Sequence, residues 1–190
     1  MPERINRRDQ IVESASQLFM KQGYTDTSVR QIAEQVGVTE AALYYHFKEG
    51  KRELLQEVIT CNLPNLMRIV ETCEGATSLH DLIVRFGQGM AQIRNSGPGH
   101  MRWIISEFHR MSDDERDLLK SQHLGLQRAL AEQIDRFIDE SDEASALAWV
   151  LFCAALGYGQ LFRSLGLETV ADISVEEFIE TLATALAAGR

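Results

Sequence analysis

The sequence predicts an all-α fold of about nine helices. Apolar residues recur at helical spacing through most of the 190 residues, and the alternation of Val, Ile and Thr that marks strands is absent. Only three prolines occur, and no Pro/Gly/Ser-rich linker or internal repeat interrupts the pattern. The chain is long enough for one large domain, or for a small domain and a larger one.

The first helix is predicted over residues 4–22 and is ended by Gly23. Its buried stripe consists of Ile11, Ala15, Leu18 and Phe19.

Two short helices follow and meet at Gly37. The first carries Val29, Ile32, Ala33 and Val36 on one face, and the second carries Ala42, Leu43 and Phe47. Gly37 can adopt the positive φ of a tight turn, Thr39 can cap the second helix, and Ser28-x-x-Gln31 fits a capping box on the first. The pattern therefore predicts a helix-turn-helix.

The outer face of the second helix carries unusual residues for a solvent-facing surface, namely Glu40, Ala41, Tyr44, Tyr45 and His46. Tyrosine hydroxyls and an imidazole can donate hydrogen bonds to phosphates, and the first residues of such a helix can reach base edges in the major groove. This face favours DNA binding. The alternative is a plain helical hairpin with a hydrated aromatic face.

At these residues the chain resembles the tetracycline-repressor (TetR) family of transcriptional regulators. The similarity runs from about Arg7 to Leu55, the first quarter of the chain, and the rest resembles the family only as a helical body of suitable length. The residues that carry it are Ile11, Ala15, Leu18, Phe19, Gly23-Tyr24, Thr27-Ser28, Ile32-Ala33, Gly37-Val38-Thr39, Leu43 to Phe47, Lys51 and Leu54. Lys48-Glu49-Gly50 places three residues before Lys51 where the family more often has two, so the phosphate contact implied for Lys51 stays open.

The resemblance implies an N-terminal three-helix DNA-binding domain, residues 1–52, and a helical ligand-binding and dimerisation domain, residues 53–190. Phosphate contacts are expected from Tyr44, His46 and Lys51. Base contacts are expected from Arg30 and from Thr39 to Ala41, and Tyr45 could make either kind. The full set of expected DNA contacts is Arg30, Thr39, Glu40, Ala41, Tyr44, Tyr45, His46 and Lys51.

The net charge of −9 is unevenly distributed along the chain. Residues 1–52 hold eight basic and seven acidic residues, whereas the remainder holds 11 basic and 21 acidic residues. This asymmetry suits a chain that turns its N-terminal part toward phosphates, although an acidic surface that only aids solubility would look the same.

A long helix is predicted over residues 51–74, with a kink or break near Asn62 and Leu63 caused by Pro64. Such a bend could carry a ligand-driven motion or could be static. The remaining helices are predicted at about 78–95, 100–111, 113–139, 142–166 and 174–188.

The stretch Ala144 to Phe162 contains no charged residue over 19 positions, close to the length of a membrane span. Its glycines and the acids that precede it favour a helix of a protein core or interface, and no membrane association is expected. Because helices 142–166 and 174–188 expose more apolar surface than one body can cover, we expect a homodimer that pairs them in a four-helix interface, as in the resembled family.

Catalytic and cofactor motifs are absent: no Gly-x-Ser-x-Gly, phosphate-binding loop, His-Glu-x-x-His or complete dinucleotide fingerprint occurs. We therefore expect no enzyme activity, no cofactor and no metal. Aromatic residues and methionine in the second domain could line a pocket for a small, mostly apolar ligand, or could simply pack the core. These residues are Phe86, Met90, Trp103, Phe108, His109, Trp149, Phe152 and Tyr158.

Cys61, Cys73 and Cys153 are odd in number and unpaired by spacing, which is typical of reduced thiols in the cytoplasm, and the N-terminus has no apolar signal-like run. The sequence thus predicts a cytoplasmic, homodimeric repressor that binds a palindromic operator and is released by an unknown small molecule. Two alternatives remain, a DNA-binding regulator whose body binds a protein partner, and a helical-bundle enzyme.

Overall fold

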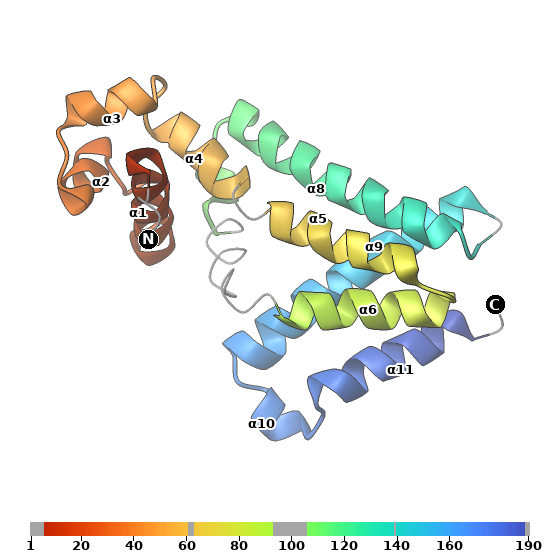
Figure 1. Ribbon diagram of the computed structural model, residues 1–190. Coiled ribbons are helices and arrows are strands. Elements are labelled where there is room, and N and C mark those ends of the chain that lie inside the picture. The colour runs from red at the N-terminus through yellow and green to blue at the C-terminus, as the bar shows by residue number, and fades with distance from the viewer. Residues whose placement is uncertain (1–5, 61–62, 93–105, 139, 189–190) are drawn as a thin grey trace, which may run out of the picture. The chain divides into compact units, whose positions relative to one another are not determined.

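The computed structural model describes residues 6–60, 63–92, 106–138 and 140–188, and every regular element within those ranges is a helix (Figure 1). The predicted all-α class is confirmed. The α-helices are α1 (Arg7–Gln22), α2 (Val29–Val36), α3 (Glu40–His46), α4 (Lys51–Thr60), α5 (Leu63–Thr72), α6 (Leu79–Gln92), α8 (Asp113–Asp135), α9 (Ser141–Tyr158), α10 (Glu168–Ala171) and α11 (Val175–Ala187). Two 3-10 turns, η1 (Cys73–Gly75) and η2 (Phe108–Arg110), and a π-helical turn, η3 (Gly159–Ser164), complete the described part.

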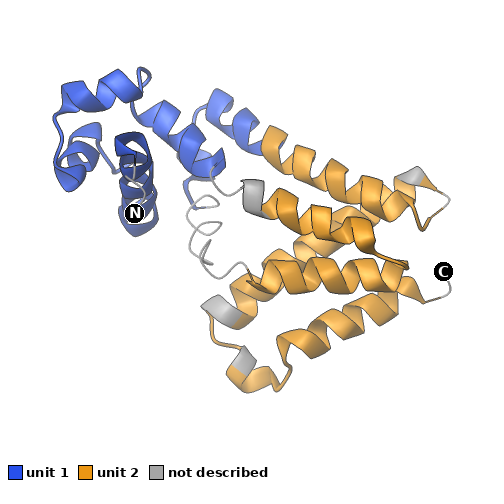
Figure 2. Ribbon diagram, viewed as in Figure 1, with its two compact units in different colours: residues 1–62, 99–120 blue, residues 63–98, 121–190 orange. Residues whose placement is uncertain are grey.

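The chain forms two compact units, and each contains segments that are distant in sequence (Figure 2). Unit 1 comprises residues 1–62 and 99–120, and unit 2 comprises residues 63–98 and 121–190. This division by packing differs from the predicted division after residue 52. The reason is that α4 and the segment that follows residue 105 bury their apolar side chains in the same core as the N-terminal helices. The functional division of the chain stays a prediction.

The core of unit 1 forms around the stripe predicted for α1, in which Ile11, Ala15 and Phe19 have no exposed surface. Its other buried members are Tyr24, Ile32, Ala33, Leu43, Phe47, Leu54, Leu55, Val58, Ile59, Met111 and Leu119. Because all three N-terminal helices and α4 contribute large buried side chains, the position of α3 is determined by core packing.

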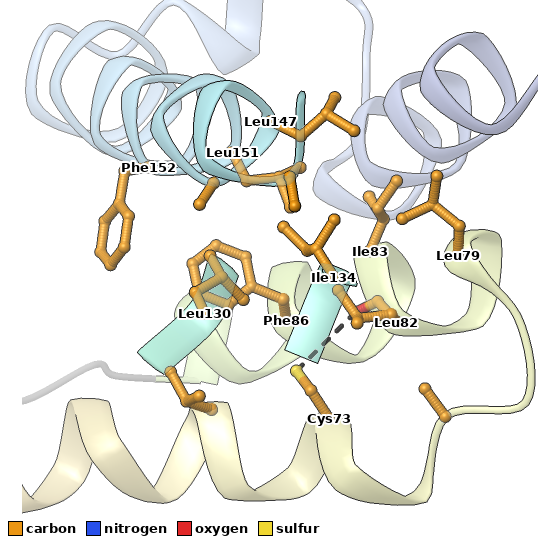
Figure 3. Close-up of a cluster of buried hydrophobic side chains, with 14 of the residues drawn as sticks. Cys73, Leu79, Leu82, Ile83, Phe86, Leu130, Ile134, Leu147, Leu151 and Phe152 are labelled. Atoms are coloured by element: carbon orange, nitrogen blue, oxygen red, sulfur yellow. Dashed lines mark hydrogen bonds between the residues drawn. The ribbon is translucent and has the colours of Figure 1, made fainter. Parts of the chain in front are cut away.

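The core of unit 2 is built by α5, α6, α8, α9 and α11. Figure 3 shows Leu130 and Ile134 of α8 among side chains of α6 and α9, with the rings of Phe86 and Phe152 at 5.6 Å in an edge-to-face arrangement. The Cys73 thiol lies in this core, where its Sγ is 3.9 Å from the Leu82 carbonyl oxygen. Burial raises the pKa of Cys73 to about 11, so this thiol is unreactive at neutral pH.

The predicted long helix 51–74 consists of two helices, α4 and α5, and Asn62 lies outside the described residues. Pro64 is the second residue of α5, where the first turn of a helix needs no backbone donor. The predicted helix 142–166 is also divided, because α9 gives way to the π-helical turn η3 at Gly159. The short helix α10 was not predicted, and of the predicted helix 100–111 only the end, from Ser106, is described.

Candidate functional site

The turn between α2 and α3 has the geometry that the sequence predicts. Gly37 has φ 74° and ψ 37°, in the left-handed region, and its N–H closes α2 on the carbonyls of Ala33 and Glu34. The Thr39 hydroxyl accepts a hydrogen bond from the Ala42 N–H at the start of α3. α2 therefore ends, and α3 begins, with a capping hydrogen bond, which restrains the angle between the two helices.

The inner face of α3 is anchored in the core of unit 1 by Leu43 and Phe47, which have no exposed surface. The Arg8 guanidinium lies 5.0 Å from the Phe47 ring centroid, and its two terminal nitrogens donate to the Glu57 carboxylate at 2.6 and 3.2 Å. α3 is thus held from behind, and its opposite face is presented to solvent.

The outer face of α3 carries the expected contact residues. Tyr45 is 80% exposed and Tyr44 46% exposed, unusual values for aromatic side chains, and Glu40 and Ala41 are also exposed. The His46 ring is half-buried and lies edge-to-face with Tyr45 at 5.4 Å. A short, exposed helix that presents two tyrosines and an imidazole resembles a binding surface more than a solubilising one.

Tyr44 is positioned by Gly50, which has φ +60°. A Cβ atom on Gly50 would lie 2.9 Å from Cε1 of Tyr44, so the bare backbone allows the ring to lie against the turn before α4. Arg30 on α2 is exposed, and its Nε donates to Glu34 at 2.8 Å. Such an exposed ion pair is weak and easily exchanged for another partner.

Lys51 lies in a different environment from the other expected DNA contacts. Its Nζ donates to the carbonyl oxygens of Tyr24 at 2.9 Å, Thr25 at 3.2 Å and Thr27 at 2.9 Å. An ammonium has three N–H groups, and all three are engaged within the chain. Burial lowers the pKa of Lys51, and nearby carboxylates including Glu115 oppose this shift. In the structure, Lys51 therefore ties the loop after α1 to the start of α4.

A polar network links the same loop to residues 107–115. The Tyr24 hydroxyl donates to Glu115 at 2.5 Å, and the Thr25 N–H donates to Glu107 at 2.9 Å. Both carboxylates are buried, which alone would raise the pKa of each. Hydrogen bonds, from Thr25 to Glu107 and from Tyr24 and Ser112 to Glu115, outweigh burial and hold the pKa values below the ordinary one.

This network cannot be predicted from local sequence, because its partners are 82 and 91 residues apart and no motif marks them. Lys48, which was not among the expected contact residues, is exposed just after α3 and forms no ion pair among the described residues. A basic side chain next to the tyrosine-rich helix α3 is the sequence feature that could have indicated a phosphate contact at Lys48.

Unit 2 contains a pocket of about 550 Å³ between α6, α9 and α11. Three of the predicted ligand residues, Phe86, Met90 and Tyr158, line it, and the ring of Phe152, which is not part of the lining, contacts that of Phe86. The other predicted members do not join them: Trp149 is 42% exposed on α9, and Phe108 and His109 belong to unit 1. Trp103 lies outside the described residues.

α11 forms one wall of the pocket through Phe178, Ile179 and Leu182, which lie on the helix 174–188 that was expected to pair in a dimer interface. The spacing of an apolar stripe shows that a helix is buried, but not what covers it. Gly87 of α6 faces this wall, and a Cβ there would lie 2.8 Å from Cγ1 of Ile179.

Two further features concern possible membranes and metals. By length and composition alone, the stretch Asp142–Phe162 could cross a membrane, and 28% of its apolar window is buried within the chain. Among the described residues, no group of three or more His, Cys, Asp or Glu side chains could hold a metal ion.

Comparison with known proteins agrees with this geometry. A sequence model of the family described as bacterial regulatory proteins, tetR family, matches residues 11–58. The chain is 40% identical over 60 residues to the uncharacterized HTH-type transcriptional regulator YxaF of Bacillus subtilis, covering 32% of this chain and 31% of YxaF. It is 24% identical over 139 residues to IcaR of Staphylococcus aureus, the HTH-type negative transcriptional regulator of the biofilm operon icaADBC, covering 70% of each.

The fold as a whole is similar to that of a TetR transcriptional regulator from Legionella pneumophila, with a TM-score of 0.73 and 20% identity over 93% of this chain and 97% of that one. Three curated relatives with at least 40% identity are matched over only 24% to 38% of their own length.

A helix-turn-helix with an anchored inner face and an exposed aromatic outer face is typical of DNA-binding proteins. Residues 11–58 match the tetR family of bacterial regulatory proteins, and the fold of the chain is similar to that of a solved TetR transcriptional regulator.

Proposed function

We propose that this chain is a homodimeric repressor that binds a palindromic operator through α3 and releases it when a small molecule binds unit 2. The observation that carries the proposal is the outer face of α3, where Tyr44 and Tyr45 are exposed while Leu43 and Phe47 fasten the helix from behind. Rigid presentation of such a face supports insertion into a major groove.

Within this proposal the base-reading residues are Arg30, Thr39, Glu40 and Ala41, and the phosphate-binding residues are Tyr44 and His46, with Tyr45 in either role. Lys48 joins the phosphate contacts because it is exposed beside α3. Lys51 takes a positioning role, since a phosphate contact would require its Nζ to leave three carbonyl oxygens.

The homodimer is supported by an exposed apolar stripe on α9. Trp149 and Val150 are 42% and 44% exposed, and Cys153, one turn further, is exposed as well. Residues three and four apart lie on one face of a helix, so these side chains form a continuous surface. A second copy related by a two-fold axis would cover this surface with its own identical stripe. We call these three residues the α9 stripe.

The release step is supported by the pocket in unit 2, whose volume lies in the usual range for sites that hold small molecules. Ligand and operator would then oppose each other reciprocally, by typically about 1–3 kcal/mol of coupling. A cytoplasmic location follows from the proposed role at DNA.

The proposal is tested by fluorescence anisotropy of labelled duplexes at several salt concentrations. Tyr45→Ala should weaken binding at least about tenfold while leaving the melting temperature unchanged, because its exposed ring contributes little to the core. Arg30→Ala and Thr39→Ala should change base preference. Unaltered binding by all three variants would overturn the assignment of α3. A compound that binds unit 2 without changing DNA affinity would instead favour a body that binds a protein partner.

A further inference from the structure

The pocket in unit 2 has walls that are largely aromatic and aliphatic. Phe86 of α6 and Phe178 of α11 line it together with Tyr158, whose ring centroid lies 4.9 Å from that of Phe178. Behind this wall, Tyr158 stacks on Phe162 at 4.8 Å with nearly parallel rings. The pocket therefore offers aromatic surface to the apolar body of a ligand.

One end of the pocket is acidic. The turn before α11 contributes Asp172, and the first turn of α11 contributes Glu177. Among the described lining residues there is no lysine, arginine or histidine to balance them. Asp172 adopts φ 45° and ψ 40°, which lie in the left-handed region. It is the only residue other than glycine with a positive φ among the described residues.

The N-terminus of α11 also faces this end, and a helix N-terminus by itself favours anions. Its macrodipole is equivalent to roughly half a positive charge, against two full negative charges from the carboxylates. Glu177 already accepts hydrogen bonds from the Ser174 N–H and hydroxyl, both at 2.8 Å. These bonds lower its pKa, so Glu177 stays ionised at neutral pH and the acidic end keeps a net negative charge.

We infer that this pocket binds amphipathic organic cations, amines or quaternary ammonium compounds whose apolar part lies against the aromatic wall and whose charged group lies near Asp172 and Glu177. Aromatic faces attract organic cations as well as apolar groups, so both parts of such a ligand are accommodated. Ligands that end in a carboxylate or phosphate are disfavoured, because they would place a third negative charge there. The inference rests on the proposed function only for its consequence, the release of DNA.

Direct binding to the DNA-free chain tests the inference with three probes that share an octyl tail: octyltrimethylammonium, octanol and octanoate. Isothermal titration calorimetry at low salt should give tighter binding of octyltrimethylammonium than of octanoate by roughly tenfold, with octanol between them. The difference should shrink as salt is added, since the acidic end is open to solvent.

Two substitutions remove the charges and keep the local structure. Asp172→Asn retains a residue that tolerates the left-handed region, and Glu177→Gln retains the capping box with Ser174. Each should reduce the preference for the cation over octanoate about threefold, and the double variant should nearly abolish it. Glu176→Gln makes the same chemical change one residue away, outside the pocket lining, and should leave the preference unchanged.

Octanoate binding as tightly as the ammonium probe, binding by none of the three probes, or an equal effect of Glu176→Gln would overturn the inference. None of these outcomes involves DNA, so they leave the proposed regulator untouched. Conversely, a failure to bind operator DNA would overturn the proposed function while the ligand preference could still be measured.

Discussion

The ammonium of Lys51 lies 4.4 Å from the ring centroid of Tyr24 and also donates a 2.9 Å hydrogen bond to the carbonyl oxygen of that residue. One side chain of α4 thereby holds both the backbone and the ring of Tyr24, in the loop after α1. Since the Tyr24 hydroxyl donates in turn to Glu115, the loop between α1 and α2 is fixed from two distant parts of unit 1.

Replacing Lys51 by methionine is therefore expected to change the stability of the chain, whereas replacing Lys48 by methionine should change the salt dependence of DNA binding. Lys51→Met should destabilise the chain by about 1–2 kcal/mol, because three carbonyl oxygens lose a charged donor at a partly exposed site, and should leave the salt dependence of DNA binding unchanged. Lys48→Met should leave stability unchanged and lower the salt slope by about 1, as expected for a lost phosphate contact. Urea denaturation and anisotropy titrations measure the two quantities. A reduced salt slope of DNA binding for Lys51→Met would show that Lys51 does contact a phosphate.

Gly50 is expected to be required for the position of Tyr44. Gly50→Ala should cost about 1–2 kcal/mol for the left-handed backbone and should in addition displace the Tyr44 ring and weaken DNA binding. Gly37→Ala is the matched control for stability, because Gly37 also has a positive φ, 74°, but a Cβ there would meet nothing within 4 Å. Equal losses of stability in the two variants would show that Tyr44 is not held by this contact.

The buried carboxylates of the polar network predict a loss of stability in acid. The pKa values of Glu107 and Glu115 lie below the ordinary glutamate value of 4.5, so both stay ionised in the folded chain when the unfolded chain already binds protons. The stability that they contribute is present above pH 4.5 and is lost as the pH falls through the lowered values.

Glu115→Gln should accordingly lower stability at pH 7 and flatten the fall of the melting temperature below pH 4.5, whereas Glu13→Gln, an exposed change on α1, should do neither. Calorimetric scans between pH 3 and pH 7 measure both effects. If the melting temperature fell as steeply below pH 4.5 in Glu115→Gln as in the wild type, the network would not control the loss of stability in acid.

The α9 stripe predicts how the dimer can be disrupted. Val150→Glu should produce monomers that keep their helical content and lose most DNA affinity, because a charge at a two-fold interface meets its own copy. Leu124→Glu, a charge at another exposed apolar position, on α8, is the control and should remain dimeric. Sedimentation distinguishes the two. Leu182 is unsuitable for this test, although its spacing suggests an interface position, because it lines the pocket.

Local signals allowed much of the fold to be predicted. Gly23 and Gly37 end their helices with positive φ, and the capping box expected at Ser28 is formed, as is a second one at Ser174. Each of these features depends on residues within four positions of one another, so it can be predicted from the local sequence.

Features that depend on distant residues could not be predicted in this way. The engagement of Lys51 with the Tyr24 loop, the burial of Glu107 and Glu115, and the part that α11 takes in the pocket depend on which elements pack together. The π-helical turn at Gly159 likewise interrupts a pattern that reads as one continuous helix.

The central claim, a dimer that reads an inverted repeat through α3, is tested most directly by selecting bound sequences from a random pool of DNA duplexes. The account predicts enrichment of two inverted half-sites at a fixed spacing set by the helical repeat of DNA, with one turn being about 34–36 Å. Tyr45→Ala should lower the yield of bound duplexes, and Val150→Glu should abolish the fixed spacing. Enrichment of no sequence, or of single half-sites by the wild-type chain, would contradict it.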